Sequence, residues 1–492
     1  MIKRILALLV IAAVAGVGSF AAVVFGSDFK LTIGSTSQDV GVSVKAKDLQ
    51  LICPGGVYRT GGVGGTKVGS FDQLPTANVL ATWSGAQGTQ LKLNGDSDGN
   101  GTRVTVPFET VAPATLQVVD VAGNATQGST LLTANQVQLV KSESINGLAA
   151  APCQRPSTDA WLLGGSVATG RETLLVLTNS SPVDATVNLE LFSNLGQIKT
   201  SALSGISVSA SSTKVLPLAS YVSKAETVAL HVHSQGGSVA SWLQVKSVRG
   251  LTAAGVDWVS PSQDFSTEPV IAGVFIRGSA AAQTLIAGNP DYADLKPVLR
   301  LFAPLSTGDA AGKPVAFNAQ LIGSNDQTFG TVIQDQLTPG TAIDFNLDGL
   351  ADGDYSAFIK ADQPILASIK LVRTNPKAQP NTDFTWLSAS DSIQGARVFV
   401  TPASGINKLA MANAGAVSVI VKLVNLQTSV VTELTVPANS NISFTLVNQV
   451  AMNIEASAPV QASMILDQGG SLANLQITDY RNLGGQVLVS IR

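Results

Sequence analysis

Two patterns of apolar and polar positions divide the chain. Residues 5–25 carry no charged side chain, and as a helix they would measure about 31 Å, enough to cross a hydrocarbon core of about 30 Å. From residue 28 onward, apolar and polar residues alternate in short runs between glycine and proline turn signals, which is typical of strands. Long helical periodicity is not evident after residue 26. We therefore predict one N-terminal transmembrane helix followed by an all-β body.

The flanks of the apolar run predict its orientation. Lys3 and Arg4 precede it, and a basic flank favours the cytoplasmic side of a membrane, which would place the residues from Ser27 onward outside. A cleaved signal peptide is the alternative, although its apolar core is usually shorter and the small-residue sites here fall inside the run. We expect a single-pass protein of the cell membrane with a cytoplasmic N-terminus and an extracellular body, or a secreted protein if the segment is cleaved.

An internal repeat organises the chain from about Trp161. Each of three copies contains an Ala-Ser-apolar triplet, and an aromatic residue follows 16 or 17 positions after its last member. The triplets begin at Ala240, Ala367 and Ala462, and the aromatics are Trp258, Trp386 and Tyr480. A second marker, a strand that ends in asparagine, is predicted before Asn179, Asn289 and Asn413, and the first two lie equally far from Phe192 and Phe302.

The spacing of these strands predicts the domain type. About seven short strands in roughly 100 residues indicate an immunoglobulin-like antiparallel β-sandwich, whereas a propeller needs a shorter and more regular period. The repeated aromatics are expected to anchor the cores, with surface stacking on sugars as the alternative. The predicted parts are a membrane anchor or signal segment (1–27), a divergent β-sandwich (28–156) and three tandem sandwich repeats (157–264, 265–394 and 395–492).

Composition narrows the functional classes. Charged residues make up 13% of the chain, hydrophobic residues 45%, and there are 46 glycines, a profile of packed sheets and not of a disordered tail. The net charge is −3 and the basic residues are scattered, so no nucleic-acid partner is expected. The two cysteines, Cys53 and Cys153, predict one disulfide in an exported chain, with two unrelated buried thiols as the alternative.

Few residues suggest catalysis or metal binding. His231 and His233 would share one face of a strand, but a zinc site needs three or four protein ligands and the chain has no other histidine. Because no Gly-x-Ser-x-Gly motif accompanies them, we expect no catalytic residue, no enzyme activity and no cofactor.

One acidic segment is a weak calcium candidate. Asn94, Asp96 and Asp98 hold the first three ligand positions of a calcium loop, and a glycine follows at the sixth. The bidentate glutamate expected at the twelfth position is missing. A plain Asp/Gly turn between strands is therefore the competing interpretation.

Several segments resemble a known family. They are 51–54 (LICP), 151–156 (APCQRP), 161–165 (WLLGG), 175–179 (LVLTN) and 249–259 (RGLTAAGVDWV). Together they resemble an actinobacterial family of large secreted proteins of unknown function, domain of unknown function family 5719, over about residues 45–490. The resemblance implies an N-terminal apolar segment followed by repeated β domains, and it implies no activity. Because 249–259 joins the first two repeats, Arg249, Asp257 and Trp258 form a candidate binding surface, with an ordered linker as the alternative.

These observations favour binding over catalysis. We expect a membrane-anchored, extracytoplasmic cell-envelope protein with a structural or interaction role, held to the membrane by residues 5–25 and contacting an envelope protein or a glycan. The alternative is an accessory subunit of a membrane enzyme complex that builds or exports cell-surface polymer. A hydrolase would need carboxylates that are distant in sequence to converge. The ligand, the oligomeric state and the arrangement of the sandwiches stay open.

Overall fold

Strands make up most of the chain, and every pairing between the named strands is antiparallel, as the sequence predicted. The computed structural model describes residues 38–44, 48–61, 71–84, 89–94, 96–100, 103–120, 130–306, 312–324, 329–375, 381–478, 480–481 and 485–491. The predicted segment 5–25 lies outside these residues. Within them, no helix has the length and apolar character needed to span a bilayer.

The chain divides into two units, one of residues 1–45 and 484–492 and one of residues 46–483. In the smaller unit, β1 (Gln38–Val44) pairs along its whole length with β37 (Gly485–Ile491). The larger unit contains four successive segments, and in each of them apolar side chains from two groups of strands enclose a hydrophobic core.

The first segment has an outer sheet in the order β2-β9-β6-β7 and an inner sheet in the order β11-β10-β5-β8. Their core includes Leu51, Trp83, Leu116 and Leu132, all buried. Its strands are β2 (Leu49–Cys53), β3 (Tyr58–Thr60), β4 (Phe71–Gln73), β5 (Ala77–Ser84), β6 (Thr89–Leu93), β7 (Asp96–Asn100), β8 (Arg103–Thr110), β9 (Ala114–Asp120), β10 (Leu131–Lys141) and β11 (Asn146–Pro152).

The second segment repeats this plan, with an outer sheet in the order β12-β18-β14-β15 and an inner sheet in the order β17-β13-β19-β20. Its elements are β12 (Asp159–Leu163), β13 (Arg171–Asn179), β14 (Ala185–Ser193), β15 (Gly196–Ile198), η1 (Ser201–Leu203), β16 (Ile206–Val208), β17 (Ser212–Pro217), η2 (Leu218–Ser220), β18 (Ala229–Gly236), β19 (Ala240–Arg249) and β20 (Thr252–Val259).

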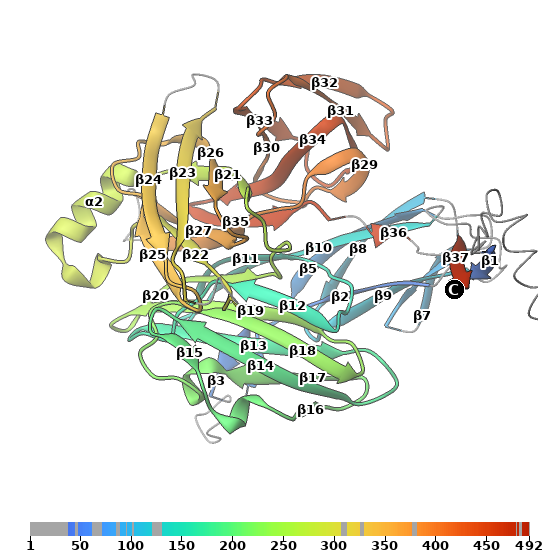
Figure 1. The fold of residues 1–492 in the computed structure, drawn as a ribbon, viewed down its shortest axis with the longest axis horizontal. Helices are drawn as coiled ribbons and strands as arrows, with labels where there is room; N and C mark the ends of the chain where they lie inside the picture. The colour runs from blue at the N-terminus through green and yellow to red at the C-terminus, as the bar shows by residue number, and fades with distance from the viewer. Residues whose placement is uncertain are drawn as a thin grey trace, which may run out of the picture. The chain divides into compact units, whose positions relative to one another are not determined.

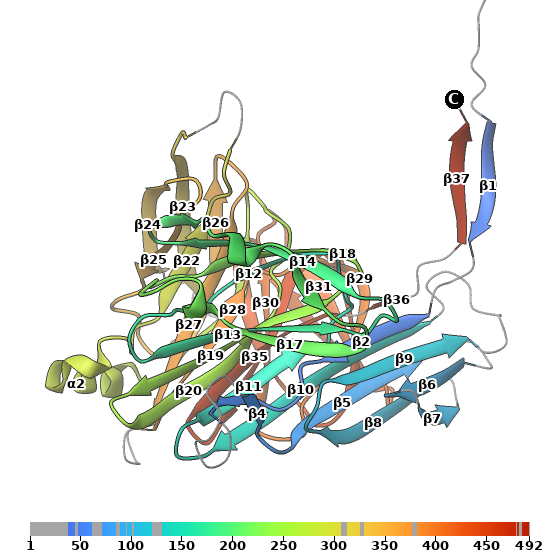
Figure 2. The ribbon, with the colours of Figure 1, turned by 90° about the horizontal axis from the view of Figure 1, so that it is seen from below.

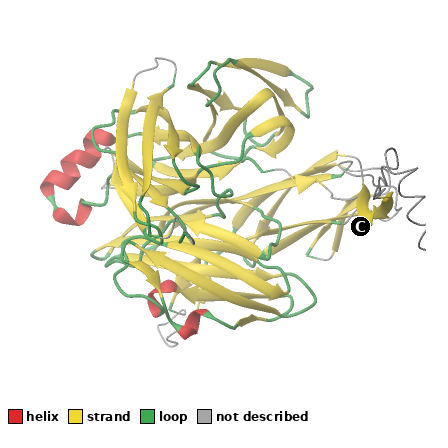
Figure 3. Cartoon of the chain, viewed as in Figure 1, coloured by secondary structure: helices red, strands yellow, loops and turns green. Residues whose placement is uncertain are grey.

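The third segment pairs an outer sheet in the order β21-β26-β23-β24 with an inner sheet in the order β25-β22-β27-β28. A ten-residue helix, α2, projects at its edge (Figure 3). Its elements are β21 (Val270–Ile276), α2 (Ser279–Gly288), η3 (Pro290–Tyr292), β22 (Val298–Phe302), β23 (Val315–Gly323), β24 (Phe329–Leu337), β25 (Ala342–Asn346), β26 (Gly353–Ala361), β27 (Leu366–Asn375) and β28 (Asn381–Ser388).

In the fourth segment the 18-residue strand β34 serves both layers. Its first half pairs with β29 and β31, and its second half pairs with β30 and β35. The short strand β36 then pairs with β10 of the first segment, which closes the chain on itself. The strands are β29 (Ile393–Val400), β30 (Ile406–Asn413), β31 (Val419–Asn425), β32 (Val431–Val436), β33 (Ser440–Leu446), β34 (Ala451–Gln468), β35 (Ser471–Gln476) and β36 (Tyr480–Arg481).

One edge strand from each segment meets the others at the centre of the larger unit. β11 packs against β20 and β35, and β28 packs against the same two strands, so the four form a ring. The four segments surround this ring (Figures 1 and 2). A long chain of locally paired segments is thereby joined into one closed body.

A single buried carboxylate ties the ring together. Asp383 on β28 accepts backbone N–H groups from Leu148 on β11 at 2.8 Å, from Leu472 on β35 at 3.2 Å, and from Val256 on β20. Gly255 has φ +131, and a Cβ atom there would lie 2.9 Å from the Asp383 carboxylate and 2.5 Å from the Phe384 ring. Glycine is needed at this position because the backbone of β20 approaches β28 so closely.

A second buried chain of polar groups crosses the same ring. The Thr385 hydroxyl donates to Asp257 on β20 at 2.9 Å, and the Asn474 amide on β35 donates to the Thr385 hydroxyl at 2.7 Å. All three side chains are buried. Buried polar groups are expected to find such partners, since an unpaired one is costly.

The repeat markers are placed unevenly. The Ala-Ser triplets lie on β19, β27 and β34, the corresponding strands of three inner sheets. Trp258 and Trp386 are buried on β20 and β28, whereas Tyr480 lies on β36. Asn179 and Asn413 are equivalent, because each amide donates to the carbonyl four residues later, at 2.8 Å.

The prediction of a strand before Asn289 is wrong. Those residues form α2, whose run of alanines favours a helix, and the carboxylate of Asp352 accepts the N–H groups of Gly278 and Ser279 at its first turn, each at 2.9 Å. The counterpart of β13 is β22, which follows the helix. The equal Asn-to-Phe spacing therefore did not identify equivalent strands.

Candidate binding site

The predicted disulfide is present. Cys53 at the end of β2 is bonded to Cys153, which directly follows β11, and both are buried. The bond joins the outer sheet of the first segment to the strand that enters the central ring. It also holds the backbone immediately before Gln154 and Arg155.

The predicted binding surface at Arg249, Asp257 and Trp258 is buried inside the ring and its border. The Arg249 guanidinium makes a two-pronged contact with Asp294, at 2.8 and 2.7 Å, and Asp257 accepts the N–H of Trp386 at 2.7 Å. Burial raises the pKa of Asp257 well above its usual value. These side chains therefore connect the second and third segments, in place of the exposed surface that the sequence suggested.

The two histidines lie two positions apart on β18, so they share one face of the strand, as predicted. The His231 ring contacts Glu190 through Nδ1 and Asp159 through Nε2, both at 2.8 Å, and stacks on Trp161 with the ring centres 4.4 Å apart. His233 is more exposed and lies 3.6 Å from Asp159. Among the described residues, no three His, Cys, Asp or Glu side chains are arranged to hold a metal ion.

The calcium candidate lies at a hairpin in the first segment. Asn94 sits in the turn before β7 with φ +50, and its side-chain oxygen accepts the N–H of Thr115 at 2.8 Å. Asp96 and Asp98 lie on β7, which pairs with β6. The side chains of Asp96 and Asp98 lie outside the described ones, so calcium binding here stays a prediction.

A polar cavity of about 250 Å³ opens where the four central strands end. Its wall comes from the residues that immediately follow β11, β20, β28 and β35, together with parts of β12, β29 and β36. We term it the junction cavity; its lining includes Arg155, Trp161, Ser262, Asp264, Ser390, Asp391, Arg397 and Tyr480. All four segments therefore contribute to one site, and the ring that Asp383 ties together positions their ends.

Two arginines on this wall, Arg155 and Arg397, contact backbone carbonyls. The Arg155 guanidinium donates to the carbonyl of Arg481 at 3.1 Å and lies over the Tyr480 ring, 5.3 Å from its centre. The Arg397 guanidinium donates to the carbonyl of Ser392, also at 3.1 Å. Neither forms an ion pair with a carboxylate of the described residues, although each retains further N–H donors.

Serine hydroxyls and carboxylates line other parts of the cavity. The hydroxyl oxygens of Ser262 and Ser390 are buried and have no hydrogen-bond partner among the described residues. Asp264 and Asp391 are exposed at the same cavity. Within the part of the chain that the structure describes, the site thus combines cations, hydroxyls and carboxylates that have no ion-pair or hydroxyl partner, a set suited to a ligand with both an anionic group and several hydroxyls.

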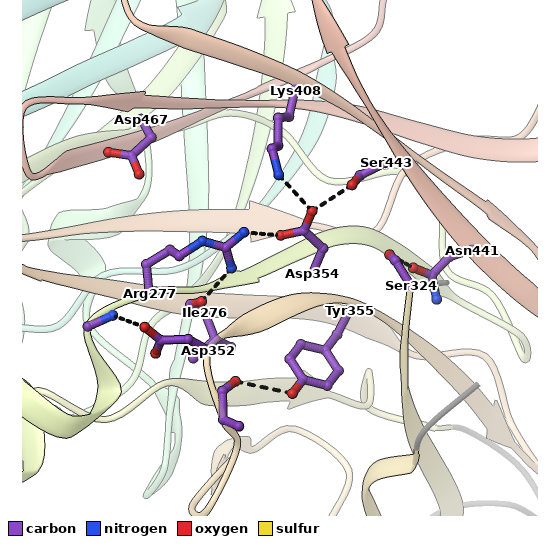
Figure 4. Close-up of polar contacts among 12 residues, drawn as sticks. Ile276, Arg277, Ser324, Asp352, Asp354, Tyr355, Lys408, Asn441, Ser443 and Asp467 are labelled. Atoms are coloured by element: carbon purple, nitrogen blue, oxygen red, sulfur yellow. Dashed lines mark hydrogen bonds and ion pairs between the residues drawn. The ribbon is translucent and has the colours of Figure 1, made fainter. Parts of the chain in front are cut away.

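Another charged cluster, in which two cations contact one carboxylate, lies between the third and fourth segments. Figure 4 shows Arg277 and Lys408 approaching Asp354, with Lys408 at 2.9 Å and the Ser443 hydroxyl at 2.5 Å. Burial alone would raise the pKa of Asp354, but these hydrogen bonds and the Arg277 charge lower it below its usual value. This cluster joins β26 of the third segment to β30 and β33 of the fourth.

A second paired cluster joins the second and third segments. The Arg300 guanidinium contacts Asp344 at 2.6 and 2.8 Å, donates to the carbonyl of Gly165 and lies 4.3 Å from the centre of the Trp386 ring. Burial lowers the pKa of the neighbouring Lys370 to about 8. Because these contacts join residues on both sides of a segment border, we assign this cluster to the architecture.

The comparison with known families agrees with the resemblance seen in the sequence. The model of a family of unknown function, DUF5719, matches residues 108–447. The matched range includes Arg155, Trp161, Asp391 and Arg397 of the junction cavity and ends before Tyr480. No curated protein matches the chain.

Sequence reasoning did not identify the junction cavity. Arg155 and Trp161 were noticed only as part of segments 151–156 and 161–165, and Tyr480 only as a repeat marker. Asp391 and Arg397 belong to none of the sequence motifs or repeat markers. Polar residues follow each of the four strands of the ring, β11, β20, β28 and β35. This pattern can be recognised in the sequence only once it is known which strands form the ring.

Proposed function

We propose that this chain, which belongs to the DUF5719 family of unknown function, is a membrane-anchored extracytoplasmic protein of the cell envelope that acts as a non-catalytic binding scaffold. In this proposal residues 5–25 form the transmembrane anchor, and the four sheet pairs are tandem immunoglobulin-like sandwiches. The body binds an envelope component and holds it near the membrane.

The observation that carries the proposal is the junction cavity at the end of a closed ring. Four sheet pairs place their loops around one polar site, and Asp383 ties the four supporting strands to one another. Binding sites are often carried by loops on a rigid framework, because a preorganised site loses less entropy on binding.

Two features support the proposed location. The Cys53–Cys153 disulfide is of the kind that persists outside the reducing cytosol. The uncharged run of residues 5–25, preceded by Lys3 and Arg4, fits an anchor with a cytoplasmic N-terminus.

Surface labelling of intact cells tests the location. A membrane-impermeant amine reagent should modify exposed lysines of the body, such as Lys422, and the protein should sediment with membranes. Replacing residues 1–27 with a cleavable export signal should release the body in soluble form. A body that is labelled only after the cells are lysed would contradict the proposal.

Crosslinking in whole cells, followed by purification from membranes, tests the role. Recovery with cell-wall material or with other envelope proteins supports the scaffold. Recovery of one stoichiometric membrane glycosyltransferase complex would replace it with the role of an accessory subunit.

A further inference from the structure

We infer that the junction cavity binds one acidic sugar unit, a polyhydroxylated ring that carries a single carboxylate or phosphate group. This inference deepens the proposed binding role and rests on it. It is argued from four properties of the cavity: its unpaired cations, its unsatisfied hydroxyls, its carboxylates and its size.

The anionic group of the ligand is recognised by Arg155 and Arg397. Both guanidinium groups line the cavity, and among the described residues each donates to one backbone carbonyl. A guanidinium matches a carboxylate or a phosphate with two parallel hydrogen bonds, and these charge-assisted bonds are about twice as strong as neutral ones. By contrast, the Arg277 guanidinium contacts the Asp354 carboxylate, and the Arg300 guanidinium contacts the Asp344 carboxylate.

The hydroxyls of the ligand are recognised by neutral and acidic side chains. The buried oxygens of Ser262 and Ser390 lack partners among the described residues, and a sugar hydroxyl would satisfy them. Asp264 and Asp391 can each accept hydrogen bonds from hydroxyl groups. These carboxylates also disfavour a ligand with several negative charges, which limits the ligand to one anionic group.

Stacking contributes little to this site. The face of Trp161 is covered by the ring of His231, and the face of Tyr480 lies under the Arg155 guanidinium. A neutral sugar could not stack on these two occupied ring faces. Recognition therefore depends on the charge and the hydroxyl pattern of the ligand.

The size of the cavity limits the ligand to one unit. Sites for drug-sized molecules occupy roughly 300–1,000 Å³, and this cavity holds about 250 Å³. A longer glycan would place one acidic unit inside and leave its remaining units outside. Because the four wall segments follow strands joined through Asp383, little rearrangement is needed on binding.

Calorimetry on the full-length protein in detergent micelles tests the inference with four probes: glucuronate, glucose 6-phosphate, glucose and inorganic phosphate. We expect at least one acidic sugar to bind about tenfold or more tightly than glucose, the effect of one charge-assisted contact. The two acidic sugars distinguish a carboxylate from a phosphate. Equal affinity for glucose, or inorganic phosphate binding as tightly as both acidic sugars, would overturn the inference, as would no binding by any probe.

Variants locate the site. Arg397→Gln and Arg155→Gln should each weaken binding of the acidic sugar about tenfold or more, while Lys422→Gln, an equal loss of charge on the exposed strand β31, should leave it unchanged. Circular dichroism should show that each variant is folded, and two arginine variants guard against the failure of one. Unchanged binding in both folded arginine variants would refute the site. The location and crosslinking experiments do not depend on these arginines, so the scaffold proposal can survive this failure.

Discussion

The Asp383 carboxylate on β28 accepts the backbone N–H of Leu148 on β11 at 2.8 Å, although the two residues are 235 positions apart in the chain. The same carboxylate accepts N–H groups from β20 and β35. One buried side chain on β28 thus accepts hydrogen bonds from backbone N–H groups of the three other edge strands. The relationship explains how four sheet pairs become one body and why the cavity at the opposite ends of the strands has a defined shape.

Loss of this carboxylate should destabilise the whole larger unit. Asp383→Ala leaves buried N–H groups of Leu148, Val256 and Leu472 without acceptors, and we expect a loss of about 3 kcal/mol or more in the free energy of unfolding. Urea denaturation followed by circular dichroism measures it. Asp335→Asn on the exposed face of β24 is the control and should change the value by less than about 0.5 kcal/mol. Equal stability of the two variants would show that the ring does not depend on Asp383.

Stability should fall as the pH rises from 5 to 8. Burial raises the pKa of Asp383 to about 8, whereas the pKa of this group in the unfolded chain is about 4. Between these values the folded protein holds a proton that the unfolded chain has released, so stability decreases by up to about 1.4 kcal/mol per pH unit. Urea midpoints measured across this range should decline less steeply in Asp383→Asn. A residual slope is expected from Asp257, whose pKa burial also raises. A wild-type midpoint that stays constant would contradict this assignment.

The disulfide should contribute strongly to stability. Cys53 and Cys153 are 100 positions apart, and closing a loop of that length restricts the unfolded chain by about 4–5 kcal/mol in the loop-entropy account. The Cys53→Ala/Cys153→Ala double variant should therefore melt at a lower temperature by differential scanning calorimetry. Adding a reductant should lower the melting temperature of the wild type and leave that of the double variant unchanged. If reduction has no effect on a wild type shown to be oxidised, the bond does not stabilise the fold.

Close packing of β20 on β28 should make Gly255 sensitive to substitution. Gly255→Ala places a Cβ atom 2.5 Å from a ring carbon of Phe384, so the strands must separate. Gly196→Ala is a matched control, since Gly196 also has a positive φ (+101) but would meet nothing within 4 Å. In both variants an alanine must adopt a positive φ, so this backbone strain is common to the two. We expect Gly255→Ala to lower the free energy of unfolding by about 2 kcal/mol or more beyond Gly196→Ala, and this difference measures the clash. A difference near zero would mean that the strands at the centre can move apart freely.

Local features were the most predictable from sequence. The alternation of apolar and polar residues identified a β protein, and the Ala-Ser triplets were correctly recognised as equivalent, since β19, β27 and β34 occupy the same place in their sheets. The cysteine pair correctly predicted the disulfide. The strand before Asn289 was wrong, because a short alanine-rich stretch between strands has its own helical preference and the repeat alignment overrode it.

Periodicity and composition concern neighbouring residues, and they were enough to predict a chain that is rich in strands and has few candidate catalytic residues. The burial of Asp257 and Trp258 in a ring, and the position of Arg155 and Arg397 at one cavity, could be seen only in the folded chain. The reason is physical: which strand edges meet depends on contacts between residues hundreds of positions apart. No local pattern records those contacts, and the candidate site exists only where they bring four strand ends together.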